Sequence, residues 1–214
     1  MNRGNMNLGL ENKRALVTGG CKGIGRGIVD ALENEGVKVY SVCRCKGYDL
    51  TQPGDVTKVL NLFGDMDILI NNVGGGGTWQ LKDWVIVHQK NIFPMVILTE
   101  GMITSMILKS WGRIINISSI FGKEAGGKPA FAMSKAAQVA FGKSYMDYFK
   151  LSGSNITINT VCPGPILVEG KEMKYDKYGM PEDVANLVTF LCSEKARWIN
   201  GTSILVDGGM SRSF

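Results

Sequence analysis

Short apolar runs alternate with longer amphipathic stretches along the whole chain. The runs have the length of buried strands, which we expect at residues 15–17, 37–42, 48–50, 68–70, 113–117, 156–161 and 204–206. Between the first two, Ile24, Ile28, Val29 and Leu32 have the spacing of one helix face. Further helices are expected at 53–63, 82–108 and 128–150 and from Pro181 onward. This alternation predicts a three-layer α/β fold built on a doubly wound parallel sheet of about seven strands.

Two connections depart from a regular alternation. Only residues 45–47 separate the second expected strand from the third, so no helix fits there and one crossover is trimmed. The helix expected at 82–108 is apolar on several sides, and Pro94 should bend it. Because Pro94, Glu100 and Lys109 interrupt its most apolar run, we interpret it as a core or subunit-interface helix and not as a membrane span.

Composition sets limits on the class of protein. The 214 residues suit one domain, spanning 1–214, with a sizeable core. The net charge of +5 is scattered without a basic block, so we expect no nucleic-acid partner. The five cysteines have no metal-binding spacing, and we expect free thiols, a cytoplasmic protein and no bound metal. The only histidine, His88, cannot form a metal site alone and is expected to be structural.

A glycine-rich segment follows the first expected strand and leads into the first helix. Such a turn cradles phosphate, because glycines let the backbone approach a pyrophosphate and the helix N-terminus offers unpaired N–H groups with a partial positive charge. Two glycines can also serve turn geometry alone, but the later strand ends supply matching pieces. The candidate phosphate-binding residues are Gly19, Cys21, Lys22, Gly23, Ile24 and Gly25.

The end of the second strand indicates which nucleotide binds. An NAD site usually has an acidic residue here, about 20 residues past the glycines, to hold the ribose 2′-hydroxyl. This chain has Arg44 beside that position and Lys22 inside the glycine turn. Two cations suit a 2′-phosphate, which favours NADP(H); the alternative is that both are ordinary surface cations.

Residues 74–77 are four consecutive glycines that follow the strand expected at 68–70. Such a run is either a flexible linker or a loop pressed against a ligand. Open α/β sheets bind ligands at the carboxyl ends of their strands, so the position favours a ligand-binding loop.

With these pieces in order, the chain resembles the short-chain dehydrogenase/reductase family, whose fold is Rossmann-like, along nearly its whole length. The motifs that carry the resemblance are Thr18-Gly-x-x-x-Gly23-Ile-Gly25, Asp49-Leu50, Asn71-Asn72-x-Gly74, Asn91, Ile117-Ser118-Ser119, Asn159-Thr-Val-x-Pro163-Gly164 and Val206-Asp207-Gly-Gly209. The resemblance implies that Asp49 and Leu50 border the adenine and that Asn72 and Gly74 border the adenosine. It also implies that Ile166 borders the nicotinamide amide and that Lys135, Pro163 and Gly164 bind the cofactor. Members of the family are commonly dimers or tetramers built on the two long helices, so we expect a homodimer or homotetramer.

The chain departs from the family's pattern at one of the catalytic residues that the resemblance implies. The family's Tyr-x-x-x-Lys pair corresponds to Phe131-Ala-Met-Ser-Lys135, while Ser119 and Asn91 match the other family catalysts. Reduction of a carbonyl leaves an alkoxide that needs a proton, and a phenyl ring cannot donate one. Losing a positioned acid–base group costs ~10²–10⁴ in rate.

Three accounts of Phe131 follow. In the first, the chain is an enzyme with another proton donor, such as Lys135, a bound water, Tyr175 or Tyr178. In the second, it is a substituted form of a parent protein that has tyrosine at this position. In the third, it binds a nucleotide without catalysis. Val168 is a second departure, since the family often has threonine near this position. The loop at 167–178 is short and polar, which favours a small or polar carbonyl or alcohol substrate, such as a sugar or hydroxy acid.

Overall fold

Six parallel strands form the central sheet of the structure, a computed structural model that describes residues 7–77, 80, 82–148, 154–168, 170 and 177–213. The strands are β1 (Arg14–Thr18), β2 (Lys38–Val42), β3 (Ile68–Asn71), β4 (Gly112–Ile117), β5 (Ile156–Pro163) and β6 (Ser203–Val206). Their order is β2-β1-β3-β4-β5-β6. Because the order reverses between β1 and β3, the sheet has its topological switch point there. The predicted doubly wound, Rossmann-like sheet is confirmed.

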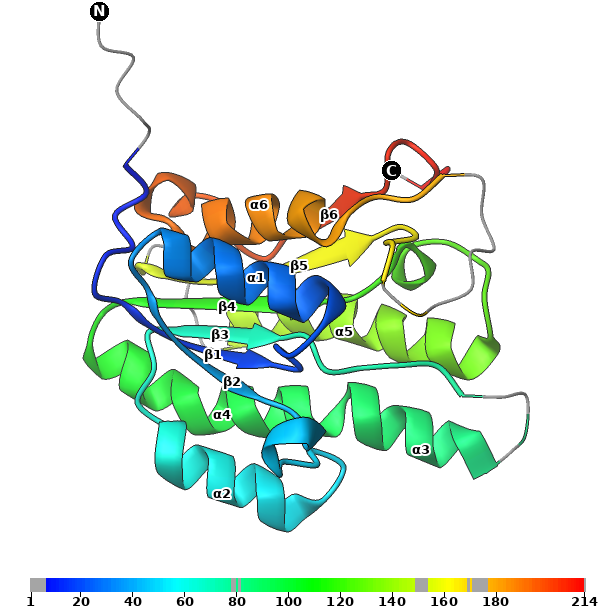
Figure 1. The fold of residues 1–214 in the computed structure, drawn as a ribbon, viewed down its shortest axis with the longest axis horizontal. Coiled ribbons are helices and arrows are strands. Elements are labelled where there is room, and N and C mark those ends of the chain that lie inside the picture. Colours follow the sequence, from blue (N-terminus) through cyan, green and yellow to red (C-terminus); the bar gives the residue numbers. More distant parts are fainter. Residues whose placement is uncertain are drawn as a thin grey trace, which may run out of the picture.

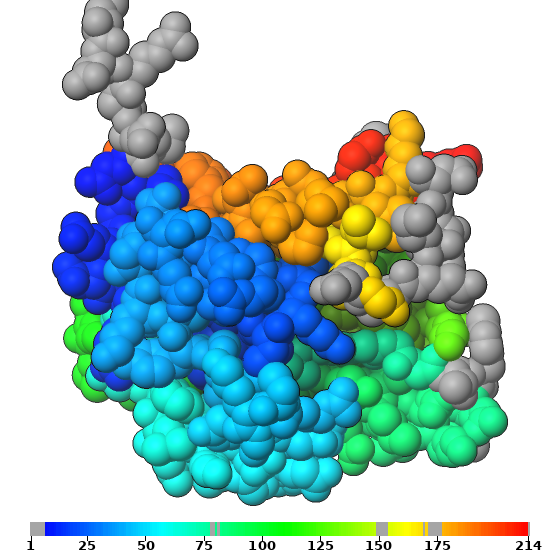
Figure 2. Space-filling view, in the orientation of Figure 1, coloured from blue at the N-terminus to red at the C-terminus, as the bar shows by residue number. Residues whose placement is uncertain are grey.

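Helices cover both faces of the sheet (Figure 1). On one face lie α1 (Gly23–Asn34) and α6 (Pro181–Cys192), which pack against each other and are adjacent in the space-filling view (Figure 2). On the other side lie α2 (Pro53–Phe63), α3 (Lys82–Asn91), α4 (Phe93–Leu108) and α5 (Pro129–Tyr148). Short 3-10 turns are η1 (Arg44–Lys46), η2 (Ile120–Gly122) and η3 (Glu194–Ala196).

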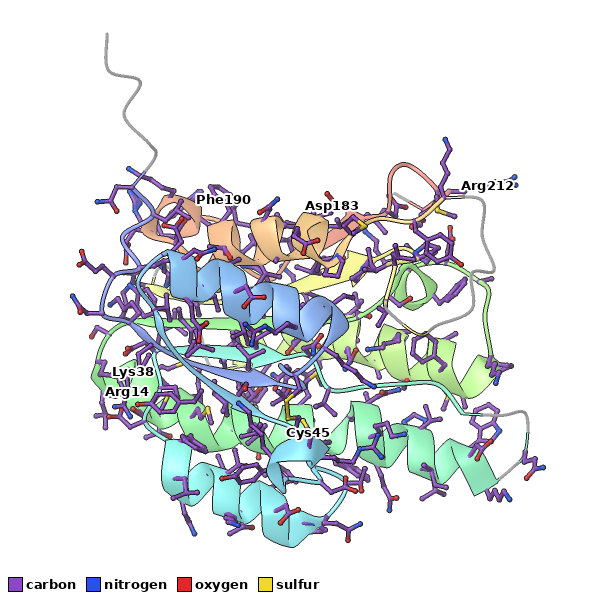
Figure 3. The ribbon with its side chains drawn as sticks, viewed as in Figure 1. Arg14, Lys38, Cys45, Asp183, Phe190 and Arg212 are labelled. Carbon is purple, nitrogen blue, oxygen red and sulfur yellow. A yellow bond between two sulfur atoms is a disulfide. The ribbon has the colours of Figure 1, made fainter. Side chains whose placement is uncertain are left out.

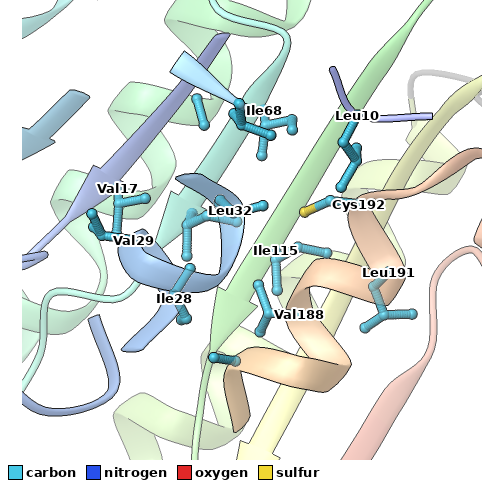
Figure 4. Close-up of a cluster of buried hydrophobic side chains, with 14 of the residues drawn as sticks. Leu10, Val17, Ile28, Val29, Leu32, Ile68, Ile115, Val188, Leu191 and Cys192 are labelled. Atoms are coloured by element: carbon cyan, nitrogen blue, oxygen red, sulfur yellow. The ribbon is translucent and has the colours of Figure 1, made fainter. Parts of the chain in front are cut away.

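The strands contribute side chains to two hydrophobic cores, one on each face of the sheet, because successive side chains point to opposite faces. In β1, Val17 packs in the core under α1 and α6, whereas Leu16 packs in the core under α2, α4 and α5. The first core also contains Ile28 and Leu32 of α1, as Figure 4 shows. Strands buried on both faces explain why the sequence shows continuous apolar runs and not alternation.

The connection after β2 is shorter than a crossover with its own helix. Among the described residues between β2 and α2, η1 is the only regular element, and residues 48–50 do not form the expected third strand. Gly47 takes a left-handed conformation (φ 80°), and the backbone N–H of Asp49 then donates to Asp55 in the first turn of α2. The sheet therefore has six described strands instead of about seven, and β2 is an edge strand.

The expected long helix is divided into α3 and α4 at Ile92, with Pro94 in the first turn of α4. By length and composition alone, the combined stretch Lys82–Leu108 is long enough and apolar enough to cross a membrane, and 44% of its most apolar part is buried inside the structure. In the structure, Leu98 and Met102 are fully buried in the core beneath the sheet. This packing is that of a core helix.

The expectation of five free thiols was wrong, because Cys21 and Cys43 form a disulfide. They are 22 residues apart in sequence, but β1 and β2 pair in parallel with Thr18 opposite Val42. The turn after β1 therefore meets the end of β2, and the two Cα atoms lie 6.6 Å apart. Sequence spacing alone does not reveal this proximity.

Candidate active site

The glycine-rich turn is fastened to the ends of three neighbouring strands. Thr18 Oγ1 donates to the carbonyl of Ile70 (3.1 Å) and accepts from the backbone N–H groups of Asn72 (2.8 Å) and Val73 (3.0 Å). The N–H of Gly19 donates to the carbonyl of Val42 at 2.7 Å. The turn therefore has a fixed position at the carboxyl ends of β1, β2 and β3.

Asn72 and two glycines pack tightly inside this turn. Asn72 Nδ2 donates to the carbonyl of Thr18 at 2.8 Å. A Cβ on Gly25 would lie 2.3 Å from the carbonyl oxygen of Gly19, which itself has φ +71°. These two glycines are thus required by the close approach of the backbone to itself, whatever ligand the turn holds.

The N-terminus of α1 has the features of an anion site. Its N-cap residue is Lys22, no side chain caps it, and its first turn has no acidic residue. The exposed Lys22 adds positive charge to that of the helix end. A Cβ on Gly23 would lie 3.2 Å from Val168, so the segment after β5 contacts the turn directly. Ile24 is half-buried and packs on the core beneath α1.

The three predicted cofactor residues after β2 differ in their exposure and in their hydrogen bonds. Arg44 is exposed, whereas Leu50 is buried. The Asp49 carboxylate accepts from Thr51 N (3.1 Å) and Thr51 Oγ1 (2.8 Å), which lowers its pKa, with a further contribution from nearby Arg44. Asp49 therefore shapes the loop before α2 and keeps its negative charge.

Asn91 holds the glycine loop that follows β3. Its Oδ1 accepts from the N–H of Gly75 (2.8 Å), and its Nδ2 donates to the carbonyl of Gly75 (3.1 Å) and to Ser134 Oγ (2.7 Å). A Cβ on Gly74 would lie 2.8 Å from Asn91 Oδ1 and 3.2 Å from Lys135 Nζ. The loop is pressed against buried polar side chains, so the flexible-linker interpretation was wrong.

Lys135 is a buried cation with neutral partners. Its side chain is 4% exposed, and Nζ donates to the carbonyl of Ile117 (2.8 Å) and to Gln138 Oε1 (2.9 Å). Gln138 Nε2 in turn donates to the main-chain carbonyl of Asn91 at 2.7 Å. Burial lowers the pKa of Lys135 to about 8. The lysine therefore holds a proton at neutral pH but is closer to losing it than a surface lysine.

Phe131 lies near this lysine and also lines a cavity. Lys135 Nζ is 5.6 Å from the centroid of the Phe131 ring. A cavity of about 300 Å³ is lined by Phe131, Gly76, Gly77 and Lys128. Lys128 Nζ donates to the carbonyl of Gly77, which ties the glycine loop to the start of α5.

Ser119 follows β4 and caps the 3-10 turn η2. Its half-buried Oγ accepts from the N–H of Phe121 at 3.3 Å. Its neighbour Ser118 instead donates to the main-chain carbonyl of Lys135 at 2.7 Å. Among the described contacts, the Ser118 hydroxyl therefore anchors α5, and the Ser119 hydroxyl caps η2.

The remaining predicted residues follow β5. Pro163 ends the strand, Gly164 N–H donates to the carbonyl of Val206 (2.9 Å), and Ile166 pairs with Gly179. These contacts bring the segment to the carboxyl edge of the sheet. Of the two tyrosines proposed as donors, Tyr178 is half-buried, and Tyr175 lies outside the described residues.

Comparison with known proteins is consistent with this geometry. Residues 47–211 match a family model described as enoyl-(acyl carrier protein) reductase. The chain is 32% identical to the 3-oxoacyl-[acyl-carrier-protein] reductase FabG of Aquifex aeolicus, covering 96% of this chain and 100% of that protein. The chain belongs to the short-chain dehydrogenase/reductase family. It is therefore a member of a family of oxidoreductases with a nucleotide-binding fold.

Two further relatives show the breadth of this short-chain dehydrogenase/reductase match. FabG of Haemophilus influenzae is 33% identical, with 94% of this chain and 99% of that protein covered. The ligand-free aldohexose dehydrogenase (AldT) of Thermoplasma acidophilum superposes with a TM-score of 0.79 at 26% identity, covering 94% and 95% of the two chains. The alignment with the Aquifex aeolicus FabG spans 250 positions, more than the 214 residues of this chain. The Aquifex protein therefore carries insertions that this chain lacks.

Sequence reasoning missed three polar side chains around the family's lysine. Ser134 and Gln138 are fully buried and bind Asn91, and Lys128 lines the cavity. Gln138 lies three residues after Lys135, so helical spacing places both on one face of α5, and this signal was present in the sequence. Lys128 precedes α5, and nothing in its local pattern distinguished it from a surface lysine.

Proposed function

We propose that the chain is an NADP(H)-dependent oxidoreductase that interconverts a carbonyl and an alcohol on a small or polar substrate. The supporting observation is the set of contacts around Lys135: a buried ammonium with a pKa of about 8, bound to neutral acceptors and lying 5.6 Å from the ring of Phe131, which lines a small cavity. A perturbed lysine beside a cavity at this edge is the arrangement expected of an active site.

The residues present fit the cofactor. The uncapped, acid-free N-terminus of α1 and the turn at Gly19–Gly25 would hold the pyrophosphate, and Lys22 and Arg44 would hold the 2′-phosphate. Asp49, Leu50, Asn72 and Gly74 would border the adenosine, and Pro163, Gly164 and Ile166 the nicotinamide. When bound, the cofactor supplies or accepts the hydride. The chain itself must position the carbonyl and supply a proton to the resulting alkoxide.

Proton supply is the step that Phe131 limits. By the resemblance, Phe131 stands at the position of the family's tyrosine and has no hydroxyl, while Asn91, Ser119 and Lys135 match the other family catalysts. In this arrangement Lys135, directly or through a water, is the donor we propose, because its lowered pKa makes it a better acid than an ordinary lysine. The Phe131 ring lines the cavity and Lys135 is not among its lining residues, so turnover should be slow.

The same ring supports a second candidate function. A nucleotide-binding protein without catalysis would keep the turn and Lys135, and it would not need a hydroxyl at position 131. We therefore keep a structural or regulatory NADP(H)-binding role as the alternative.

The deciding experiment compares the wild-type chain with Phe131→Tyr. We expect NADPH oxidation with a suitable carbonyl to rise by ~10²-fold or more, with little change in NADPH affinity. Phe141→Tyr is the matched control, because it adds the same hydroxyl on α5 in a ring stacked on Tyr145, 4.8 Å between centroids. If neither form reduces any substrate while both bind NADPH, the alternative holds.

The substrate panel follows from the cavity and the relatives. A volume of about 300 Å³ is at the lower end for ligand pockets, and Lys128 places a cation in its wall. Compounds with an anionic group near the carbonyl are thus favoured. The panel should include 3-oxoacyl thioesters and aldohexoses, since the names of the FabG and AldT relatives give these as their substrates.

Cofactor choice is tested by removing Arg44, one of the two cations proposed to hold the 2′-phosphate. Each charge-assisted contact to a 2′-phosphate contributes ~1.5–3 kcal/mol, so Arg44→Ala should weaken NADPH binding by roughly tenfold or more and leave NADH unchanged. Arg26→Ala is the control, since Arg26 is an exposed cation of α1 that pairs with Asp30. Equal wild-type affinities for NADPH and NADH, both insensitive to Arg44→Ala, would contradict the proposal.

We also propose a homodimer or homotetramer built on α4 and α5. These helices expose large apolar side chains, among them Phe93 (54%), Leu108 (82%) and Tyr148 (79%). Light scattering should show an oligomer that Leu108→Glu dissociates. Leu62→Glu on α2 is the control, because it makes the same substitution at an exposed leucine (55%) on another helix. A wild-type monomer at micromolar concentration would rule the proposal out.

A further inference from the structure

Three cysteine sulfur atoms gather where the glycine-rich turn meets the end of β2. Cys21 and Cys43 form the disulfide, and Cys45 Sγ lies 2.8 Å from Cys43 Sγ. All three sulfur atoms lie within 4.8 Å of one another. Figure 3 shows the disulfide as a yellow bond beside the labelled Cys45. The other two cysteines, Cys162 and Cys192, are free and buried.

We propose that these three cysteines form a thiol–disulfide site that regulates nucleotide binding. The Cys21–Cys43 disulfide closes the end of the site that receives the 2′-phosphate, and Cys45 exchanges with that disulfide. The inference rests on the proposed function, because it assigns the regulated ligand as NADP(H). Disulfides in reducing compartments are usually transient and redox-sensing, which fits a bridge placed beside a ligand site.

Exposure assigns a role to each thiol. Cys45 is exposed, Cys21 is half-buried and Cys43 is buried. A small disulfide from solution therefore meets Cys45 first. Lys22, Arg44 and Lys46 are exposed cations adjacent in sequence to the three cysteines, and they attract an anionic oxidant such as glutathione disulfide.

The exchange balances with a small disulfide as the oxidant. The Cys45 thiolate attacks the small disulfide, forms a mixed disulfide and releases one small thiol. The Cys43 thiolate then attacks the Cys45 sulfur and releases the second small thiol, which leaves a Cys43–Cys45 bond. Finally the Cys21 thiolate attacks the Cys43 sulfur and frees the Cys45 thiolate. The protein loses two electrons and two thiol protons, the small disulfide gains both, and excess small thiol reverses every step.

The closed bridge affects the phosphate end of the site directly. It joins the residue before Lys22 to the residue before Arg44, so it limits how far the two cations can move relative to each other. A 2′-phosphate needs to approach both side chains. We therefore expect the oxidised protein to bind NADPH about tenfold more weakly than the reduced protein, as loss of one charge-assisted contact predicts.

The test measures thiol state and nucleotide affinity separately on the full chain. Protein is equilibrated with reduced or oxidised glutathione, the glutathione is removed, and mass spectrometry of peptides maps the disulfides. NADPH affinity of each form is then measured by fluorescence titration. The proposal expects a Cys21–Cys43 bond only in the oxidised form, together with the weaker affinity.

Two cysteine variants separate the roles of the thiols. Cys21→Ser should abolish the affinity difference between the two treatments. Cys45→Ser should keep the difference but slow both opening and closing by about tenfold, because the exposed relay thiol is gone.

Four outcomes overturn the inference or part of it. Equal NADPH affinities in protein with and without a mapped Cys21–Cys43 bond overturn the regulation. Absence of that bond after glutathione disulfide overturns the thiol–disulfide site. A reduced protein that holds Zn²⁺ through the three thiols and resists glutathione disulfide overturns it in favour of a metal site. If neither form binds NADPH, the proposed cofactor and its regulation both fail, while the disulfide map still decides whether the bond forms.

Discussion

A buried cation lies near each end of strand β4: Arg113 belongs to the strand, and Lys135 reaches it from α5. One cation has a charged partner and the other has neutral partners. Near its start, Arg113 is fully buried, lies 3.7 Å from Glu194 and lies over the ring of Trp111. At its far end, the Ile117 carbonyl accepts from Lys135, whose other partner in the described structure is the neutral Gln138. Burial lowers the pKa of both cations, but Glu194 partly offsets this for Arg113. The fully partnered cation stabilises the fold, whereas the cation with neutral partners is the one that we propose for proton transfer.

The largest effect is expected at Arg113. Its guanidinium donates to the carbonyls of Gly112 (2.9 Å) and Asn155 (2.7 Å) and to Asn155 Oδ1 (2.9 Å). Arg113→Met would remove the donor to Asn155 Oδ1 and the cation facing Glu194, while the Asn155 carbonyl would keep its bond from the N–H of Gly112 (3.2 Å); we expect a loss of about 3–5 kcal/mol in the free energy of unfolding, measured with urea. The control is Arg14→Met, where an exposed arginine pairs with Asp65 at 3.4 Å and should contribute at most about 1 kcal/mol. Similar losses at both sites would contradict the contrast.

The next effect is a pH-dependent difference between the wild-type chain and Lys135→Met. The pKa of Lys135 falls from 10.5 when unfolded to about 8 when folded, so the unfolded chain binds more protons between these values. Wild-type stability relative to the methionine variant should therefore rise with pH from about 8 to 10.5, by roughly 3 kcal/mol. Urea unfolding of both proteins at several pH values checks this. A flat difference would mean that Lys135 titrates like a surface lysine.

The sequence predicted the parts of the fold that depend on local pattern. Glycines, apolar runs and helix-starting prolines gave the parallel sheet and nearly every element boundary, because these features act within a few residues. The short segment 48–50 was misjudged, since three residues cannot show whether they pair with a distant strand. The disulfide was missed for the same reason: only the pairing of β1 with β2 brings Cys21 to Cys43.

The candidate site was predictable where a motif existed and not elsewhere. The structure brings together Asn91, Lys135 and Gly74, whereas the resemblance placed Gly74 beside the adenosine and did not pair it with the other two. Their supporting contacts through Gln138 and Ser134 required knowledge of which side chains face one another across two helices. Such contacts depend on tertiary packing, which no spacing rule contains.

A smaller change should make Lys135 resemble Arg113. Gln138→Glu would place a carboxylate where an amide oxygen now accepts from Nζ at 2.9 Å. An opposite charge at this distance favours the ammonium, and we expect the pKa of Lys135 to rise by roughly 1–2 units. The stability difference against Lys135→Met, measured in the Gln138→Glu background, should then begin to rise at a correspondingly higher pH. An unchanged pH profile would show that Gln138 does not set the pKa of Lys135. Gln89→Glu, on the neighbouring helix α3, is the matched variant, because it adds the same charge at another position.

The smallest effect is expected at Ser134, which links the two sides of the site. Its Oγ accepts from Asn91 Nδ2 (2.7 Å) and donates to the main-chain carbonyl of Phe131 (2.8 Å). In Ser134→Ala, Asn91 Nδ2 keeps its bond to Gly75, so the cost should be only about 1 kcal/mol of stability. The freed amide should nevertheless hold the glycine loop less firmly, and amide hydrogen exchange at Gly75 should become faster.

Ser118→Ala is the matched control for that last experiment. Ser118 is also a buried hydroxyl, and it donates to the carbonyl of Lys135 (2.7 Å) without contacting Asn91 through any described hydrogen bond. It should therefore lose similar stability while exchange at Gly75 stays unchanged. If both variants speed exchange equally, the loop responds to general loosening of α5, and Ser134 has no separate positioning role. If only Ser134→Ala does so, the chain of contacts from Phe131 through Ser134 and Asn91 to the glycine loop is a mechanical link between the two walls of the cavity.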